Sequence, residues 1–232
     1  NKFLKEISEI IEQKQGIFIL EHTDLLSIIK NNLFDTICHE HLAYYSAKVI
    51  IGMINKNNLK VFDIKRNKIN GGSTRFYICH KNSNYIENRN KINQIIKEET
   101  GFKLSIKGTY IKFYKKILLI KKDLNKKLKN IKKDGKIIHG YGASTKGNVL
   151  LQFFKIDKSL LEFIADRNPL KVNCYTPGTK FIIKSEKFSR RLRPDFYLVL
   201  PWHFKNEILE REKKIRSKGT KFIFPLPNIE VR

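Results

Sequence analysis

The densest group of chemically active side chains in the sequence is His39-Glu40-His41. An imidazole titrates near neutral pH, so His41 could act as a general base while Glu40 holds a neighbouring group by a hydrogen bond. Two histidines at i and i+2 of an extended segment point the same way, which would also suit a metal ion. The further His or Cys ligands typical of zinc sites do not follow at short spacing, so we expect no metal here. A histidine pair in an ordinary core loop is the alternative interpretation.

A second group is the stretch GYGASTKGN at residues 140–148, between a strand-like and a helix-like segment. Glycines let the backbone approach a ligand, and the first amides of a helix can donate to an anion. Ser144, Thr145 and Lys146 add hydroxyls and a positive charge, so the stretch favours a phosphate. It departs from the Walker pattern and from the dinucleotide fingerprint G-x-G-x-x-G, because position 145 is threonine. A loop that mainly packs the helix onto the sheet is the alternative.

Two acidic residues follow predicted strands, and open α/β sheets bind ligands outside the carboxyl ends of their strands. Glu21 and His22 follow the apolar run at residues 17–20, and we take Glu21 as a candidate cofactor-binding residue. An ordinary loop is the other interpretation of this pair. Asp166 lies 24 residues beyond Gly142, where it would either contact a ribose or cap the turn into residues 167–169.

The elements that position these groups alternate along the last hundred residues. Strands are predicted at 136–139, 161–165, 196–200 and 221–224, with helices up to residue 154 and over 204–216. Strands that alternate with helices at this spacing imply right-handed crossovers and a parallel sheet. The predicted fold class is therefore α/β, with a Rossmann-like C-terminal domain.

The first part of the chain shows a less regular pattern. Helices are predicted at 1–13, 24–31 and 105–133, and strands at 17–20, 61–64 and 75–79, with a tight turn at Gly71-Gly72. The last of these helices is long and basic, because residues 103–136 contain 13 lysines and two acidic residues. Aromatic interleaving and a recognition motif are missing, so we expect a solvated helix and no nucleic-acid partner.

The length, charge and cysteine content of the sequence limit the class of protein that it can encode. The 232 residues suffice for one large domain or two small ones, and no apolar run approaches the roughly 18 residues that cross a bilayer. Subtracting 22 acidic from 47 basic residues gives a net charge of +25, which would attract phosphates of any kind. The three cysteines, at positions 38, 79 and 174, form no C-x-x-C pair. No secretory signal is recognisable, so we expect a cytoplasmic protein and a fragment of a longer one.

Residues 34–46, FDTICHEHLAYYS, resemble the F-D-T-I-Y-H-E-H-L-S-Y-F-S signature of S-adenosylmethionine-dependent sugar C-methyltransferases. Later blocks resemble the same family in the same order. They are GGSTR at 71–75, HGYGASTKGN at 139–148, DRNP at 166–169, TPGT at 176–179, PD at 194–195 and LPWHF at 200–204. The resemblance spans essentially the whole chain.

The resemblance implies that a methyl group is added to the carbon beside the ketone of a nucleotide-linked, usually dTDP-bound, 4-keto deoxysugar. It also implies three parts: a small zinc-binding domain, an S-adenosylmethionine-binding Rossmann domain and a C-terminal Rossmann-like domain. We assign residues 1–68 to the end of the second part and residues 69–232 to the third. The zinc cysteines and the glycine-rich cofactor loop are missing from this sequence, so we expect zinc only in the missing N-terminal domain, and we expect the chain to be inactive alone.

The resemblance further gives His41 the role of the base and Glu40 that of a neighbouring catalytic carboxylate. The residues expected to contact the nucleotide-diphosphate sugar are Ser144, Lys146 and Asn148, together with Gly142 and Tyr141. Cys38 stands where the family usually has tyrosine and cannot donate a phenolic hydrogen bond. A non-catalytic sugar-nucleotide-binding module is the alternative function. The residues 202–204 are expected to pack in the core, and the sequence does not indicate an oligomeric state.

Overall fold

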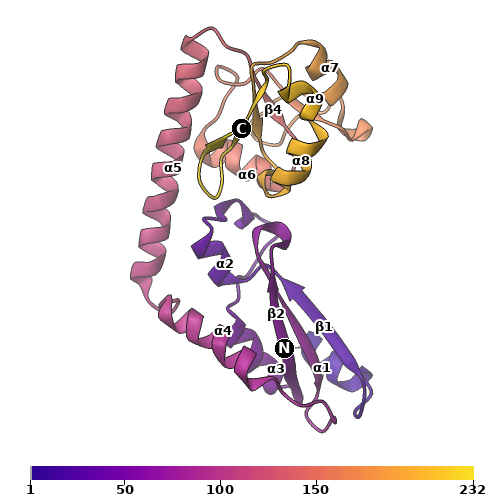
Figure 1. Ribbon diagram of the computed structural model, residues 1–232. Helices are drawn as coiled ribbons and strands as arrows, with labels where there is room; N and C mark the ends of the chain where they lie inside the picture. The colour runs from indigo at the N-terminus through magenta and orange to yellow at the C-terminus, as the bar shows by residue number, and fades with distance from the viewer. Residues whose placement is uncertain (1) are drawn as a thin grey trace. The chain divides into compact units, whose positions relative to one another are not determined.

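The computed structural model describes residues 2–232, which form two compact units (Figure 1). Unit 1 comprises the chain up to Asn31 together with Leu42–Phe113. Unit 2 comprises Asn32–His41 and Tyr114–Arg232. The segment that carries His39-Glu40-His41 therefore belongs to unit 2, although the chain on both sides of it belongs to unit 1.

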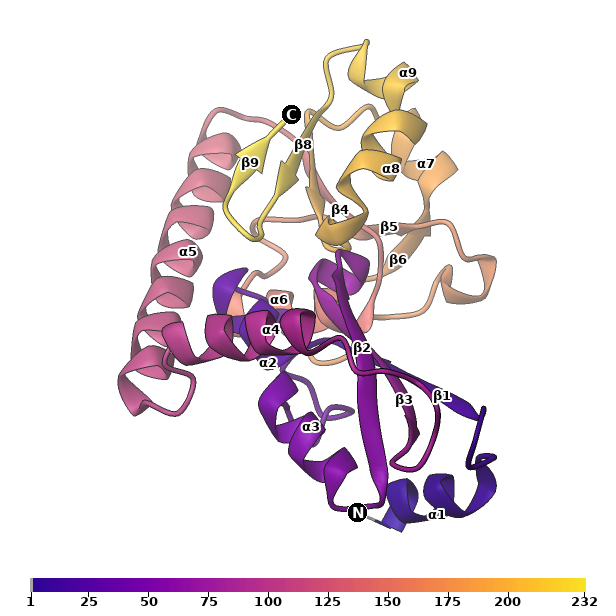
Figure 2. The ribbon, with the colours of Figure 1, turned by 60° about the horizontal axis from the view of Figure 1, so that its bottom comes forward.

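Unit 1 contains a three-stranded antiparallel sheet in the order β1-β3-β2 (Figure 2). Its strands are β1 (Ile17–His22), β2 (Leu59–Asn67) and β3 (Ser73–His80), and its helices are α1 (Lys2–Ile10), α2 (Leu25–Lys30), α3 (Ala47–Asn55) and α4 (Arg89–Gly101), with a 3₁₀ turn η2 (Ile69–Gly71). Since β3 is antiparallel to both neighbours, β1 and β2 run in the same direction. Ile54, Leu59, Phe76 and Ile78 are completely buried at the centre of this core.

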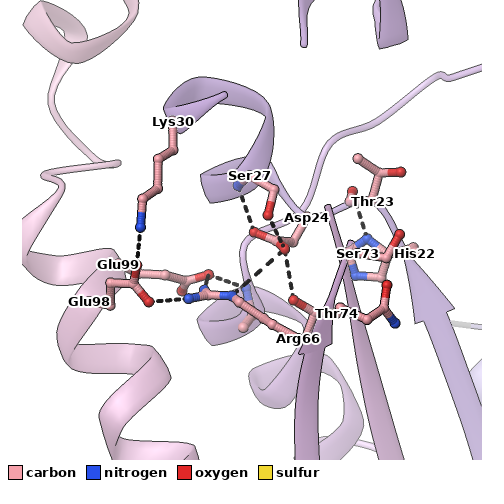
Figure 3. Close-up of polar contacts among 12 residues, drawn as sticks. His22, Thr23, Asp24, Ser27, Lys30, Arg66, Ser73, Thr74, Glu98 and Glu99 are labelled. Atoms are coloured by element: carbon pink, nitrogen blue, oxygen red, sulfur yellow. Dashed lines mark hydrogen bonds and ion pairs between the residues drawn. The ribbon is translucent and has the colours of Figure 1, made fainter. Parts of the chain in front are cut away.

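The buried carboxylate of Asp24 is the centre of a hydrogen-bond network in unit 1 (Figure 3). Asp24 caps α2, because its Oδ1 accepts the amide of Ser27 at 2.9 Å. Its Oδ2 accepts the hydroxyls of Ser27 at 2.9 Å and Thr74 at 2.8 Å, and Nε of Arg66 lies 3.8 Å away. These donors offset the cost of burying the charge, so the carboxylate fixes α2 to β2 and β3.

Unit 2 contains a six-stranded sheet in the order β6-β5-β4-β7-β8-β9. The strands are β4 (Ile138–Tyr141), β5 (Ile164–Asp166), β6 (Ile183–Ser185), β7 (Phe196–Val199), β8 (Lys221–Phe224) and β9 (Glu230–Val231). All neighbours are parallel except β8 and β9. The chain first extends the sheet to one side of β4 and then returns to the other side with β7. This is the strand order of the doubly wound nucleotide-binding fold, whose switch point lies between β4 and β7. The predicted α/β class with a Rossmann-like parallel sheet is confirmed.

Helices cover both faces of this sheet (Figure 1). They are α5 (Lys107–Lys133), α6 (Thr145–Phe154), α7 (Glu186–Arg191), α8 (Lys205–Arg211) and α9 (Lys213–Arg216), with short 3₁₀ turns η1 (Phe34–Thr36), η3 (Pro169–Lys171) and η4 (Trp202–Phe204). Within unit 2, α5 packs against α6, since Lys121 and Asn125 donate to the carbonyls of Phe153 and Phe154. Among the helices of residues 2–232, none is both long and apolar enough to cross a membrane.

The predicted long helix is confirmed as α5, and the predicted strands are present with shifted ends. The helix predicted over 204–216 is interrupted, because η4, α8 and α9 follow one another there. The predicted domain boundary at residues 68 and 69 falls in the turn between β2 and β3, two strands that pair within unit 1. The two compact units part within α5, after Phe113, and the assignment of residues 69–232 to a C-terminal domain stays a prediction. The assignment of residues 1–68 to a methyltransferase domain stays a prediction.

The Asp24 network predicts the effect of Thr74→Val. The substitution keeps the side-chain shape but removes a donor to a buried carboxylate, so unit 1 should lose about 1–3 kcal/mol of stability. Native-state hydrogen exchange of the β3 amides measures this loss. Thr100→Val is the control, because that hydroxyl is exposed and bonds only the carbonyl of Ile96. Equal effects of the two substitutions would contradict the role given to Asp24.

Candidate functional site

Two loops meet at the switch point of the unit 2 sheet, one after β4 and one after β7. Gly142 has a φ of +84°, and a Cβ atom there would lie 2.6 Å from Cδ of Pro201. A Cβ atom on Gly147 would lie 2.8 Å from Cβ of Leu200. Only glycine permits both close approaches. These two glycines therefore allow the loop and the start of α6 to pack closely against the chain that follows β7.

A cavity of about 380 Å³ lies at the same edge of the sheet. Its lining includes Ser144, Arg167, Asn168, Lys171, Phe204 and Arg211. The Ser144 hydroxyl caps α6 by accepting the amide of Gly147 at 3.0 Å, and Lys171 Nζ donates to the carbonyl of Ala143 at 2.7 Å. The lining also contains three carboxylates, Asp166, Glu186 and Glu207, and Arg211 is paired with Glu186 at 3.0 Å. Arg167 and Lys171, beside the first turn of α6, are the cations that could contact an anionic ligand, and Phe204 could contact an apolar part of it.

The carboxylate of Asp166 holds the backbone of the loop after β4 and of the turn after β5. Its Oδ2 accepts the amide of Ala143 at 2.7 Å and its Oδ1 accepts the amide of Asn168 at 2.8 Å. Both oxygens thus hold backbone, which favours the turn-capping interpretation over a contact with a ribose.

The segment with the histidines is anchored to unit 2 by three contacts. Asn32 Nδ2 donates to the carbonyl of Pro227 at 2.8 Å, and the ring of Phe34 stacks on Phe154 with centroids 4.8 Å apart. Trp202 Nε1 donates to Oδ2 of Asp35 at 2.8 Å, and both residues are buried. Trp202 directly follows the β7 loop, so the indole joins this segment to the switch point.

His41 is exposed and its ring is oriented by the same segment. Nδ1 lies 2.7 Å from the carbonyl oxygen of Thr36, which can only accept, so this nitrogen carries the proton. The neutral ring therefore has its lone pair on Nε2, the form that a general base requires. The segment is not extended as predicted: the His41 amide donates to the carbonyl of Cys38, which closes a turn. Glu40 is exposed, with Oε1 4.0 Å from Nε2 of His39.

Three titratable groups near the hydrogen bond between Trp202 and Asp35 have shifted pKa values. Burial raises the pKa of Asp35 above its usual range, against the lowering effect of the Trp202 hydrogen bond. Burial also lowers the pKa of Lys146, which Asp35 and Cys38 partly oppose. The pKa of His203 is lowered to about 4 by burial and by the charge of Lys146. His203 is therefore neutral near pH 7.

The other predicted site residues occupy several environments. Tyr141 lines the cavity, but its hydroxyl donates to Glu212 at 2.8 Å and accepts from Arg211. Asn148 has a buried Oδ1 with no hydrogen-bond partner among residues 2–232. Glu21 lies in unit 1, where Asn67 at 2.8 Å and Arg75 at 2.6 Å hold its carboxylate and lower its pKa.

Sequence reasoning missed Asp35 as a site residue and placed Trp202 in the core only. A signal existed for Asp35, because an isolated carboxyl between Phe34 and Ile37 in an apolar run is a candidate for burial with a specific donor. Nothing in the local pattern identifies Trp202 as that donor.

The chain belongs to the family defined by the C-methyltransferase C-terminal domain, whose model matches residues 68–227. Among curated proteins it is similar to the C-methyltransferase NovU of Streptomyces niveus, with 30% identity over 216 residues. That alignment covers 93% of this chain and 51% of NovU, so the chain spans about half the length of this relative.

The raised pKa of Asp35 predicts how stability depends on pH. Because the unfolded carboxyl ionises near pH 3.9 and the folded one only at higher pH, this group makes unit 2 less stable as the pH rises through that window. Asp35→Asn keeps an acceptor for Trp202 and should therefore be more stable than the wild type at pH 7, with the difference vanishing below about pH 4. Urea unfolding followed by the fluorescence of Trp202, the single tryptophan, measures it.

Asp157→Asn is the matched control in unit 2. Hydrogen bonds from Ser159 lower the pKa of the exposed Asp157, so its contribution is present at pH 7 and lost in acid. This variant should be slightly less stable than the wild type at pH 7. If Asp35→Asn were instead less stable than the wild type at pH 7, ionisation of the buried carboxyl would not destabilise the folded state, and the prediction would be wrong.

Proposed function

We propose that the protein methylates the carbon beside the ketone of a nucleotide-linked 4-keto deoxysugar, with His41 as the base. Membership of the C-methyltransferase family and the similarity to NovU support methyl transfer to carbon. The observation that carries the mechanism is the 2.7 Å hydrogen bond from His41 Nδ1 to Thr36, since it leaves the basic lone pair on Nε2.

The nucleotide diphosphate is assigned to the cavity at the switch point. Arg167, Lys171 and the amides at the start of α6 provide positive potential for the phosphates, and Phe204 offers an apolar surface. Gly142, Ser144 and Tyr141 form walls of that cavity, in line with their predicted contact with the substrate. The net charge of +25 would steer a diphosphate toward the protein.

The reaction begins with proton removal. A hydrogen beside a ketone is acidic because its electron pair can move onto the carbonyl oxygen, so an imidazole can remove it when the enolate is stabilised. His41 Nε2 accepts that proton and Thr36 holds the resulting imidazolium through Nδ1. The role of Glu40 is to hold a neighbouring group by hydrogen bonding.

S-adenosylmethionine, the methyl donor expected for this family, would supply an electrophilic methyl group. Glu21, the predicted contact, instead has its carboxylate held by Arg75 and Asn67, so no step through the methyl donor is assigned to residues of this chain. The expected zinc domain likewise stays a prediction.

Proton removal by His41 predicts the behaviour of His41→Asn in the complete enzyme. The variant should lose exchange of the hydrogen beside the ketone with solvent deuterium by at least about 100-fold, because no other base is assigned. Mass spectrometry of the keto sugar nucleotide in D₂O measures it. His39→Asn, which changes an exposed histidine two residues away, should exchange normally. Undiminished exchange in His41→Asn would remove His41 from this role.

Assignment of the nucleotide to the cavity predicts that this chain binds dTDP. Calorimetric titration should show binding that Arg167→Ala weakens about tenfold, since one charge-assisted contact is lost. Arg89→Ala, which changes an exposed arginine of unit 1, is the control. Double-stranded DNA should not bind tightly at physiological salt. Binding of dTDP without any exchange activity in the complete enzyme would favour the non-catalytic binding module.

A further inference from the structure

A second cavity of unit 2, of about 620 Å³, lies at the edge of the six-stranded sheet that is opposite the switch point. Its lining includes residues 193–195, which directly precede β7, and residues 218–220, which directly precede β8. Since β4, β7 and β8 are parallel, the amino ends of β7 and β8 lie at the other edge from the loop after β4. We call this the amino-edge cavity. A molecule bound there is remote from a reaction at the carboxyl ends of the strands.

Hydrogen bonds fix the walls of the amino-edge cavity. Thr220 Oγ1 donates to the carbonyl of Pro194 at 2.8 Å, and the amide of Lys221 donates to the carbonyl of Asp195 at 2.9 Å. The loop before β7 is thereby joined to the loop before β8. Oδ2 of Asp195 also accepts the amide of Ile137 at 2.9 Å, which ties the same loop to the chain before β4. The cavity is therefore formed by backbone that is held in place, as a binding site requires.

Two arginines of the lining are neutralised by carboxylates. Glu212 is buried and accepts Nε of Arg190 at 3.1 Å, and its Oε1 lies 3.5 Å from Nε of Arg211. Glu186 accepts the same two arginines, Arg190 at 2.7 Å and Arg211 at 3.0 Å. Two positive and two negative charges meet in this group, so it adds no net charge to the cavity.

Three other cations of the lining remain uncompensated. The second carboxylate of the lining, Asp195, pairs with Lys136 at 3.1 Å. Arg193, Lys214 and Lys218 have no carboxylate partner within ion-pair distance among residues 2–232. Like charges that line one cavity repel one another, and an anion between them would relieve that repulsion. The amino-edge cavity thus has three positive charges available for a ligand.

The backbone of Arg193 is in the left-handed region, with a φ of +49°. This conformation is strained for a residue with a Cβ atom, and glycine would adopt it without that strain. Strained residues of this kind are concentrated at binding and active sites. The arginine side chain at this position, which lines the cavity, is therefore consistent with a role in binding.

We propose that the amino-edge cavity binds a small molecule that carries several phosphate charges, through Arg193, Lys214 and Lys218. A planar guanidinium can bind a phosphate through two hydrogen bonds, and two ammonium groups suit further phosphates. A single carboxylate would neutralise only one of the three charges. The volume lies within the range of small-molecule sites, and Pro194 and Ile215 offer an apolar wall. This inference does not depend on the proposed function.

Calorimetric titration of this chain with inorganic tripolyphosphate tests the proposal. Physiological ionic strength is used, because salt screens the general field of a protein with a charge of +25. Lys214→Met/Lys218→Met should weaken binding at least about tenfold, since two charge-assisted contacts are lost. Lys115→Met/Lys116→Met removes the same charge from exposed positions of α5 and should change the affinity less than about twofold. Arg167→Ala, at the switch-point cavity, should likewise have little effect.

Arg193→Gly separates the binding role from a structural one. Lys155→Gly is its matched control, because Lys155 is exposed, has a φ of +54° and lies outside the cavity. Both substitutions remove one positive charge and relieve a left-handed backbone, so neither should lower the urea concentration at which unit 2 unfolds. Only Arg193→Gly should weaken tripolyphosphate binding, by about fivefold.

Four results would overturn the proposal. The first is that tripolyphosphate does not bind. The second is an equal loss of affinity in Lys214→Met/Lys218→Met and Lys115→Met/Lys116→Met, which would show that the anion responds to the basic surface in general. The third is an equal loss in Arg167→Ala, which would assign the anion to the switch-point cavity. The fourth is that Arg193→Gly and Lys155→Gly bind tripolyphosphate equally.

Discussion

The buried hydrogen bond from Trp202 to Asp35 is the contact on which the arrangement of unit 2 depends. It joins residues 167 positions apart, one at the switch point of the sheet and one in the segment with His41. Asp35 is completely buried and its second oxygen has no partner among the described residues, so this carboxyl relies on the indole. The stack of Phe34 on Phe154 adds area but sets no unique orientation. Together with the hydrogen bond from Asn32 to the carbonyl of Pro227, this directional bond fixes the segment that carries His41 on the rest of unit 2.

The loop after β4 and the first turn of α6 place neighbouring side chains in two different parts of unit 2. Ser144 lines the cavity of unit 2 at the switch point, whereas Lys146, two positions later, is absent from that lining and is near enough to the buried Asp35 for its pKa to be affected by that charge. Close packing makes this possible, because Gly142 and Gly147 bring the loop and α6 against the chain after β7.

Local patterns predicted the elements with strong periodicity and little else. The strands β4, β5, β7 and β8 are apolar runs between turn residues, and α5 is a long proline-free stripe, so these elements could be predicted. The short strands β6 and β9 were not predicted. α4 was not predicted, since its sequence RNKINQIIKEETG is mostly polar, and α3 is almost uniformly apolar. The pairing of Glu21 with Arg75 follows from the register of β1 on β3, and the anchor of Asp35 from a distant indole. Such contacts depend on tertiary structure, which no window of sequence contains.

The division of the chain has a consequence for biosynthesis. Asn32–His41 emerge from the ribosome before Leu42–Phe113 of unit 1, yet they pack on residues of unit 2 that are made more than a hundred positions later. Closing so long a loop carries an entropic cost, and contacts of high sequence separation form slowly. Unit 1 can thus mature during translation while Phe34 and Asp35 wait for their partners. Until α6 and the chain after β7 have been made, the ring of Phe34 and the carboxyl of Asp35 lack the partners that bury them in the folded protein.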